Sequence, residues 1–323
     1  LQAAANLYSQ FKRHHLSLKD GDLMNPGALD EIADAFKGGQ SVLVCCNTVK
    51  RAQGAFVELH KRLGLASEII LLHGRFNGKD RLAKEKIVRE ATGSKSDQRK
   101  PILLIATQVV EVSLDIDLDV IYTDPAPLEA LLQRFGRINR RRSKPCAYVY
   151  VFREPADGQR VYNEALVRSS LAVLEKNNNM MIDESKISDW LDEVYTGKIA
   201  ESWKQEYQEA YDDFWEGAIL SLRAFNSDES LEEAFYQAFD SLEVLPMILE
   251  EDYKKGLEEN PLEASQLLVS VRWGQYAQLE RNGLGYYDKE RKIRVVNANY
   301  SYEFGLDLRG KKDDCKSHSI TPK

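Results

Sequence analysis

Short apolar runs alternate with amphipathic stretches through the first half of the chain. Between these runs, apolar residues recur at helical spacing, which predicts helices that begin near Pro26 and at Thr48, Lys79 and Leu128. Apolar strands that alternate with helices form parallel sheets covered on both faces. We therefore predict a doubly wound α/β domain at residues 25–155, with buried strands at Ser41 to Cys46, Glu68 to Leu72, Ile102 to Ala106, Asp119 to Tyr122 and Ala147 to Phe152.

The pattern changes on either side of this domain. Residues 1–24 show weak periodicity, and we expect a linker or an entering helix there. Residues 156–310 are predicted to form a second domain, acidic and mainly helical. Its strand candidates are LLVSVRW (Leu267 to Trp273) and KIRVVN (Lys292 to Asn297). Residues 311–323 are expected to be a disordered tail.

Composition narrows the class of protein. Of the 323 residues, 43% are apolar, which suits two ordinary globular domains. No apolar run approaches the length of a membrane span, so we expect no membrane partner. The cysteines show neither a disulfide framework nor a metal-binding spacing, which favours a reducing cytoplasm and no metal site; they are Cys45, Cys46, Cys146 and Cys315.

The net charge of −7 conceals two regions of opposite sign. Between Asp183 and Glu259 there are 22 acidic and 6 basic residues, a balance of −16 that leaves +9 for the remainder. A basic face can therefore coexist with an acidic region, and nucleic acid is not excluded as a partner.

The most basic stretch follows the fourth predicted strand. Six of the eleven residues from Arg134 to Lys144 are basic and none is acidic. Gln133, Gly136, Arg137 and Arg140 stand there in the spacing Q-x-x-G-R-x-x-R. A solvated helix face would carry paired glutamates, whereas guanidinium groups without them favour an anionic partner such as a polyphosphate.

Polar residues follow nearly every predicted strand. In a doubly wound sheet, ligands bind at the carboxyl ends of the strands, where hydroxyl, amide and cationic groups can hold phosphate oxygens. Taken singly, these residues suit helix caps, turns or loops equally well. The candidates in chain order are Asn47, Thr48, His73, Arg75, Thr107, Ser113, Asp115 and Asp124.

At these positions the chain resembles the second half of superfamily 2 helicases. The segments VLVCCNTV, LLHGRF, LLIATQVVEVSLDIDLDVIYTDPAP and QRFGRINRR look like their motifs IV, IVa, V and VI. The residues in the segments LHGRF and TQVVEVSLDID most resemble those of the CRISPR-associated helicase-nucleases of type I systems. The resemblance is looser in the C-terminal region, where it rests on N-x-x-Y-S-x-E-x-G-L-D (Asn297 to Asp307).

The resemblance implies a RecA-like second helicase domain and assigns roles to matching residues. Arg137 and Arg140 would face an ATP γ-phosphate, with Arg140 as the arginine finger and Gln133 as a helper. Asp115 would contact the ribose or couple nucleotide to strand movement. The phosphate backbone of single-stranded DNA would be held by Thr48, Arg75 and Thr107, and less certainly by Asn47, His73 and Ser113.

The printed sequence contains no G-x-x-x-x-G-K-[ST] phosphate loop, no D-E-x-H or D-E-x-D segment and no His-Asp dipeptide. We therefore expect the isolated chain neither to hydrolyse ATP nor to cut DNA. ATP and Mg²⁺ would bind only with an N-terminal half that carries the HD nuclease and the first RecA-like domain. By resemblance, a crRNA-guided surveillance complex is a further partner. The alternatives are a non-enzymatic single-strand-binding or partner-binding module, and the same half of a non-CRISPR helicase.

Overall fold

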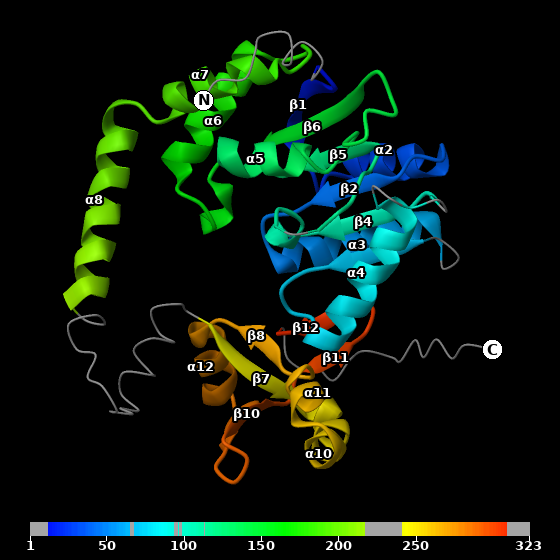
Figure 1. The fold of residues 1–323 in the computed structure, drawn as a ribbon, viewed down its shortest axis with the longest axis vertical. Coiled ribbons are helices and arrows are strands. Elements are labelled where there is room, and N and C mark those ends of the chain that lie inside the picture. The colour runs from blue at the N-terminus through cyan, green and yellow to red at the C-terminus, as the bar shows by residue number, and fades with distance from the viewer. Residues whose placement is uncertain are drawn as a thin grey trace. The chain divides into compact units, whose positions relative to one another are not determined.

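The computed structural model describes residues 12–64, 68–93, 96, 99–112, 114–216 and 241–308 (Figure 1). The chain divides into two compact units. The first unit comprises Leu1–His73 and Ala83–Arg223, and the second comprises Gly74–Leu82 and Ala224–Lys323. The predicted tail at 311–323 lies outside the described residues.

A six-stranded sheet forms the centre of the first unit. Its order is β1-β6-β5-β2-β4-β3, and all neighbouring strands are parallel, which confirms the predicted doubly wound α/β class. The strands are β1 (His14–Asp22), β2 (Val42–Cys45), β3 (Ile69–Leu72), β4 (Leu103–Ala106), β5 (Val120–Thr123) and β6 (Ala147–Glu154). The helices are α2 (Pro26–Lys37), α3 (Val49–Leu63), α4 (Gly78–Thr92), α5 (Leu128–Phe135), α6 (Glu164–Lys176), α7 (Ile187–Val194) and α8 (Gly197–Phe214), with short 3-10 turns η2 (Gln108–Val110), η3 (Gly158–Arg160) and η4 (Glu184–Lys186).

The local sequence explains these elements. Every residue of β2, β4 and β5 is buried, as expected for strands covered on both faces. Helix α2 has Pro26 in its first turn, where a missing N–H costs nothing. Helix α3 starts at Thr48, whose side chain accepts from the N–H of Arg51, and ends at Gly64, whose φ of +82° suits glycine.

The predicted linker or helix over residues 1–24 is wrong where the structure describes it. Residues 14–22 form β1, which pairs in parallel with β6 along its length. Burial in β1 alternates in period two, with Leu16 and Leu18 inward, but the histidine pair, Lys19 and two aspartates mask this short pattern in the sequence. The predicted α/β domain therefore gains a strand before residue 25.

The compact units also divide elsewhere than at the predicted boundary of 155. Helices α6 and α7 follow that point, yet Val173, Leu174 and Trp190 belong to the same hydrophobic core as the strands of the sheet. In contrast, Gly74–Leu82 belongs to the second unit although the sequence places it inside the α/β region.

The second unit combines helices with a small sheet in the order β8-β7-β10-β9 and a separate hairpin of β11 and β12. The predicted strands in LLVSVRW and KIRVVN are confirmed as β8 and β10. The elements are β7 (Leu242–Pro246), η6 (Met247–Leu249), α10 (Glu250–Glu259), α11 (Pro261–Ser265), β8 (Val269–Val271), α12 (Trp273–Arg281), β9 (Gly285–Asp288), β10 (Ile293–Val296), β11 (Asn299–Ser301) and β12 (Gly305–Asp307). Across the described ranges, no helix is both long and apolar enough to span a membrane.

Candidate functional site

The basic segment from Arg134 to Lys144 is not one surface. Arg134 is fully buried, whereas Arg137 is half-buried and Arg140 to Arg142 are exposed. The reason is that α5 ends at Phe135 and the chain then turns beside the residues that precede β5: Ile138 forms a parallel bridge with Leu118. The segment thus contributes to three separate environments.

The first environment is a buried hydrogen-bond network around Arg134. Its guanidinium donates to Glu111 Oε1 at 2.9 Å, to Thr123 Oγ1 at 2.8 Å and to Asn47 Oδ1 at 3.0 Å. The hydroxyl of Tyr162 accepts a further bond at 3.1 Å. A buried arginine needs such partners because an uncompensated charge is expensive away from water. Arg134 therefore fastens α5 to the carboxyl ends of β2 and β5.

A second arginine braces the same edge of the sheet. The guanidinium of Arg51 forms a bidentate ion pair with the buried Asp124, at 3.0 and 2.7 Å. It also donates to Asp22 Oδ1 at 2.6 Å. Asp124 Oδ2 in turn accepts from the backbone N–H of Asn47 at 3.0 Å. Bidentate pairs of this kind fix geometry as well as charge. The ends of β1, β2 and β5 are thereby held in register.

The predicted strand-contacting residues of the first unit lie at this carboxyl edge. Asn47 is 2% exposed, and its amide donates to Pro125 O and accepts from Arg134. Thr48 is half-buried and caps α3. His73 and Thr107 are 0% and 4% exposed, so that in this conformation their side chains present little surface. Thr48 is consequently the most accessible of these four residues.

Arg75 belongs to a different unit from Thr48 and Thr107. Its carbonyl accepts from the N–H of Leu306 at 2.9 Å, and the nearby Asn77 N–H donates to the hydroxyl of Tyr300 at 3.2 Å. Burial lowers the pKa of Arg75, although Asp307 acts in the opposite direction. The loop that follows β3 is thus fastened to the β11–β12 hairpin.

The second environment of the basic segment lies before β5 and brings together two predicted residues. Arg140 Nη1 pairs with Asp115 Oδ1 at 3.2 Å, and both side chains are more than 40% exposed, at 47% and 41%. The backbone N–H of Arg140 donates to Asp117 Oδ1 at 2.7 Å. Asp117 is only 1% exposed and also pairs with Arg99 at 3.0 Å. Arg140 therefore has a fixed backbone and an accessible guanidinium.

Arg137 lies near Arg140 but makes different contacts. Its Nη1 donates to the carbonyl of Leu114 at 2.8 Å and its Nη2 to that of Glu111, while its buried Nε has no partner within the described part of the chain. Burial lowers the pKa of Arg137, and the positive charge of Arg140 adds to this effect. Arg137 therefore holds the loop between β4 and β5 against the turn after α5.

The remaining two predicted residues do not join this group through described contacts. Gln133 is exposed on α5, and its side chain makes no hydrogen bond with another described residue. Ser113 lies outside the described residues. The roles proposed for both stay predictions.

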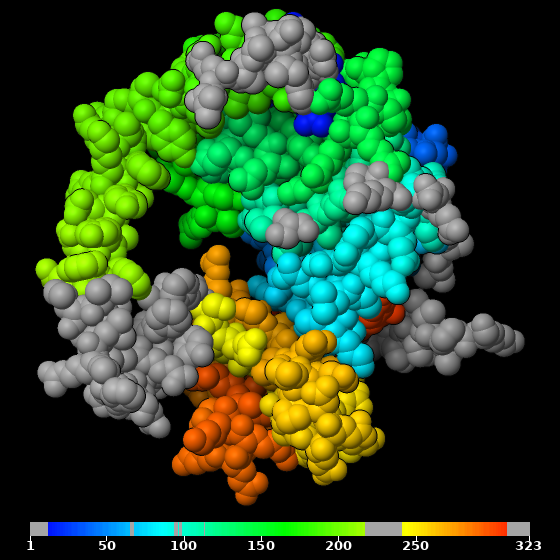
Figure 2. Space-filling view, viewed as in Figure 1, coloured from blue at the N-terminus to red at the C-terminus, as the bar shows by residue number. Residues whose placement is uncertain are grey.

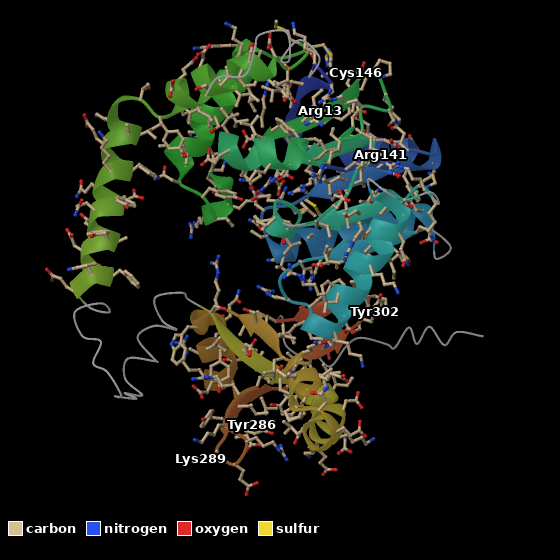
Figure 3. All side chains as sticks on the ribbon, in the orientation of Figure 1. Arg13, Arg141, Cys146, Tyr286, Lys289 and Tyr302 are labelled. Carbon is tan, nitrogen blue, oxygen red and sulfur yellow. The ribbon has the colours of Figure 1, made fainter. Side chains whose placement is uncertain are left out.

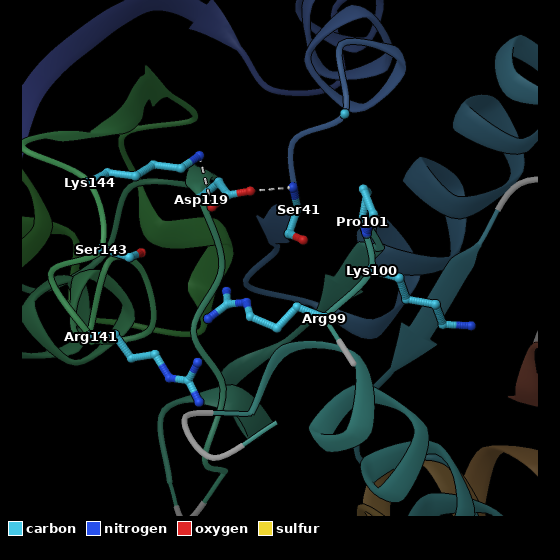
Figure 4. Close-up of a pocket in the computed structure, with 9 residues that line it drawn as sticks. Ser41, Arg99, Lys100, Pro101, Asp119, Arg141, Ser143 and Lys144 are labelled. Carbon is cyan, nitrogen blue, oxygen red and sulfur yellow. Dashed lines mark hydrogen bonds and ion pairs between the residues drawn. The ribbon is translucent and has the colours of Figure 1, made fainter. Parts of the chain in front are cut away.

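The third environment is a basic pocket of about 310 Å³ at the opposite ends of the strands (Figure 4). Arg141 and Lys144 contribute to it, together with Arg99 and Lys100 from the segment before β4. Lys144 pairs with Asp119 at 2.9 Å, and Arg99 and Lys100 also have carboxylate partners. Most of the positive charge in this pocket is already compensated within the protein.

Sequence reasoning missed three groups that organise the site: Arg134, the Arg51–Asp124 pair and Asp117. The arginines are indistinguishable in the sequence from surface basic residues, because their carboxylate partners lie 23 and 73 positions away. The only signal for Asp117 in the sequence is its place two residues after the candidate Asp115, a spacing that is also typical of turns. None of these positions required an unusual residue type.

Comparison with known proteins gives this site a family context. Residues 38–143 match the family described as CRISPR-associated nuclease/helicase Cas3, C-terminal. A putative CRISPR-associated nuclease/helicase Cas3 of Methanocaldococcus jannaschii is 27% identical over 95% of the chain, but the match spans only 43% of that relative. The CRISPR-associated endonuclease/helicase Cas3 of Escherichia coli is 30% identical over 52% of the chain and 20% of its own length.

Solved structures agree on the fold. The crystal structure of T. fusca Cas3-ADP superposes with a TM-score of 0.65 at 19% identity, covering 91% of the chain and 42% of that protein. A chain in the CRISPR RNA-guided surveillance complex, pre-nicking, gives a TM-score of 0.59, also at 19% identity, and covers 91% of the chain and 44% of its own. Residues 38–143 thus match the Cas3 C-terminal family model at the predicted motifs, and the chain shares the fold of the Cas3 structures.

Proposed function

We propose that this Cas3-like C-terminal helicase domain supplies one half of an ATP-dependent motor on single-stranded DNA that acts in CRISPR type I interference. The observation that carries the proposal is the arrangement of Arg140, whose backbone is fixed by the buried Asp117 while its guanidinium stays accessible. An arginine finger needs both properties, because it must reach a phosphate on another domain without losing its position.

The contacts of Arg140 fit a γ-phosphate partner. An exposed pair such as Arg140 and Asp115 contributes only about 0 to 1 kcal/mol, so a polyphosphate with more negative charge can displace the carboxylate. Asp115 is then available to accept a hydrogen bond from a ribose hydroxyl. Gln133, on the preceding helix, would help to orient the phosphate or a water.

Arg137 suits a positioning role. Two of its donors are already used on the carbonyls of Leu114 and Glu111, so it joins the motif V loop to motif VI. Its buried Nε has no hydrogen-bond partner among the described residues. We propose that Arg137 transmits movement between the nucleotide side and the strand side of the domain, while Arg140 makes the phosphate contact.

When bound, ATP and Mg²⁺ would supply the phosphoryl chemistry, and they would be held mainly by a first RecA-like domain. Stabilising charge on a loosely bonded γ-phosphate is the task left for the arginine, and fingers of this kind contribute roughly 10³ to 10⁵ in rate. Without the phosphate loop and acidic motif of the other half, Arg140 has no nucleotide to act on. We therefore propose that the chain alone is inactive.

Single-stranded DNA is the proposed track. Thr48 and Thr107 at the carboxyl edge of the first unit would contact phosphates, and Arg75 of the second unit would make its own phosphate contact. His73 and Ser113 are proposed as further contacts. Asn47, held by Arg134, would position the end of β2 for Thr48. Phosphate contacts read no sequence, which suits a motor that travels along any strand.

The proposed partners follow from the relatives. The curated nuclease/helicases are longer than the matched region, which spans 43% of the archaeal relative. We propose that an HD nuclease and first RecA-like half completes the enzyme, and that a crRNA-guided surveillance complex recruits it. A pure strand-binding module would share the edge contacts but would have no use for an accessible, backbone-fixed Arg140.

The test is reconstitution. The purified chain should show no ATP turnover with or without single-stranded DNA, and addition of a first RecA-like half from a Cas3 relative should produce DNA-stimulated turnover. ATP turnover by the chain alone would contradict the proposal if the activity stays with the chain through successive purification columns. Strand binding without any stimulated turnover in the reconstituted mixture would favour the binding module.

A further inference from the structure

The second unit contains an arginine surrounded by aromatic rings. The guanidinium carbon of Arg294 lies 5.4 Å from the ring centroid of Trp273, 5.8 Å from that of Tyr276 and 5.7 Å from that of Tyr287. These four residues, here called the Arg294 cage, come from β10, α12 and β9. Cation–π contacts at such distances hold a guanidinium in place and leave its N–H edges free to bind.

The fold explains how the cage forms. Arg294 is directly opposite Tyr287 in the antiparallel pair of β10 and β9, so the two side chains share one face of the sheet. Val296, two residues along β10, lies on that same face and packs with Tyr276 and Leu279 of α12. Arg294 therefore emerges at the margin of a small hydrophobic core.

The charge of Arg294 is uncompensated within the described part of the chain. Arg294 is half-buried, yet it forms neither an ion pair nor a hydrogen bond there. On the same hairpin, Arg291 is neutralised by Glu250 at 3.0 Å and by Asp288 at 2.9 Å. A partly desolvated guanidinium with unused donors is a prepared site for an anion, and phosphate oxygens match its fork.

The rings define the kind of anion. Tyr287 is 46% exposed, and Trp273 is partly exposed, so flat apolar surface borders the cation. The β9–β10 hairpin that carries Tyr287 lies at the surface of the second unit (Figure 2). A phosphate contact beside accessible ring faces is the combination that binds single-stranded nucleic acid. The bases stack on the aromatic rings, and the backbone phosphates pair with the cation.

The cage also connects to the proposed strand contacts. Arg272 immediately precedes Trp273, and its charge helps to lower the pKa of Arg75, after the larger effect of burial. Arg75 and Arg272 are therefore near enough to influence one another within the second unit. A strand held at Arg75 would therefore meet a second positive charge in the residue next to Trp273.

We propose that the Arg294 cage is a second single-strand contact, in which Arg294 binds a backbone phosphate and the rings of Tyr287 and Trp273 pack against bases. The proposal rests on the proposed function, since it requires that the chain bind single strands. It adds a site in the second unit that the helicase motifs do not include.

The test measures binding of fluorescent oligothymidylate to the whole chain over a salt series. Arg294→Gln should lower the slope of log K against log salt by about 0.7, because one phosphate contact is lost. Arg294→Lys should keep the slope, since it retains the charge. Arg281→Gln, which removes an exposed arginine of α12 outside the cage, is the matched control and should leave affinity nearly unchanged.

A neighbouring tyrosine provides a second control. Tyr286 is 44% exposed, similar to Tyr287, but it is opposite Val295 and lies on the other face of the sheet. Tyr286 and Lys289 extend from this hairpin in Figure 3. Tyr287→Ala should weaken binding by about fivefold or more through lost base stacking, whereas Tyr286→Ala should not. Circular dichroism melts establish that each variant is folded.

The outcomes separate the two proposals. If the wild-type chain binds the oligonucleotide and neither Arg294→Gln nor Tyr287→Ala weakens that binding, the Arg294 cage is not a strand contact. Strand binding at the other proposed residues would still stand. Absence of binding by the wild-type chain, with the completed enzyme also inert to DNA, would overturn the proposed function and this site with it. Displacement of the oligonucleotide by polyglutamate as readily as by unlabelled oligothymidylate would show selection for charge alone and would also overturn the proposal.

Discussion

The buried guanidinium of Arg134 donates to the side-chain oxygen of Asn47 at 3.0 Å, which joins helix α5 to the end of β2. The same guanidinium binds Glu111 and Thr123, so three loops at the carboxyl edge depend on one side chain. This edge holds the proposed contacts to single-stranded DNA. Its geometry is therefore set by a residue that has no exposure to the strand.

Removal of Arg134 should be severely destabilising. Arg134→Met leaves the Glu111 carboxylate and three polar side chains without their partner, and breaking a buried pair in this way costs about 3 to 5 kcal/mol. Urea unfolding would measure the loss. Glu111→Met combined with Arg134→Met should recover part of it, because the double variant leaves no uncompensated charge. A loss below about 1 kcal/mol for the single variant would show that the network contributes little.

Acidification should destabilise the chain through His14. Burial lowers the pKa of His14 from 6.5 to about 4, while its hydrogen bond to the carbonyl of Ile138, at 3.0 Å, acts in the opposite direction. The folded state thus binds fewer protons than the unfolded state between these values. The free energy of unfolding should fall as pH decreases from about 6.5 towards 4, by about 3 kcal/mol for this group.

His14→Gln provides the comparison for that pH dependence. Glutamine keeps an N–H donor for Ile138 but does not titrate, so its unfolding free energy should vary less between pH 6.5 and 4 than that of the wild type. Parallel pH profiles for the two proteins would exclude His14 as the cause. Because Ile138 lies between Arg137 and Arg140, the same titration should loosen the arginine turn.

Tyr300→Phe should weaken strand binding without unfolding the second unit. The Tyr300 hydroxyl donates to Asp80 Oδ2 at 2.6 Å and accepts from the N–H of Asn77 at 3.2 Å, which holds the loop that carries Arg75. Phenylalanine keeps the ring and removes both bonds, at a cost of about 1 to 3 kcal/mol. Tyr302→Phe, on a more exposed neighbour, is the control. Equal affinities of the two variants for oligothymidylate would show that the contacts of the β11–β12 hairpin do not position Arg75 for strand binding.

Arg75→Ala tests the phosphate contact itself. Loss of one backbone contact should reduce the salt slope of single-strand binding by about 0.7 and should affect all sequences alike. Oligonucleotides of different base composition, titrated over a salt series, measure both properties. An unchanged salt slope would show that Arg75 does not contact the DNA backbone.

The regular part of the fold was predictable from the sequence because buried parallel strands and amphipathic helices have strong periodic signals. The runs at Ser41 to Cys46 and Ile102 to Ala106 became β2 and β4 nearly residue for residue. The sequence did not predict β1, because this edge strand includes His14 and Lys19 and has only a few inward apolar positions. Period-two signals in so short a segment are easily masked by charge.

The site was predictable only in part, for a different physical reason. The family resemblance assigns both Asp115 and Arg140 to the nucleotide, and in the structure their side chains form an ion pair. The resemblance could not show that Arg134 is buried, because exposure depends on partners distant in sequence. Nor could it assign the loop after β3 to the second unit, since Tyr300 lies 220 positions from Asp80.

We propose that Arg140 serves ATP turnover rather than strand binding. Both properties can be measured on one Arg140→Ala protein that is reconstituted with a first RecA-like half. ATP turnover should fall by roughly 10³-fold or more, while affinity for oligothymidylate is largely retained. Retained turnover with weakened strand affinity would instead assign Arg140 to the DNA.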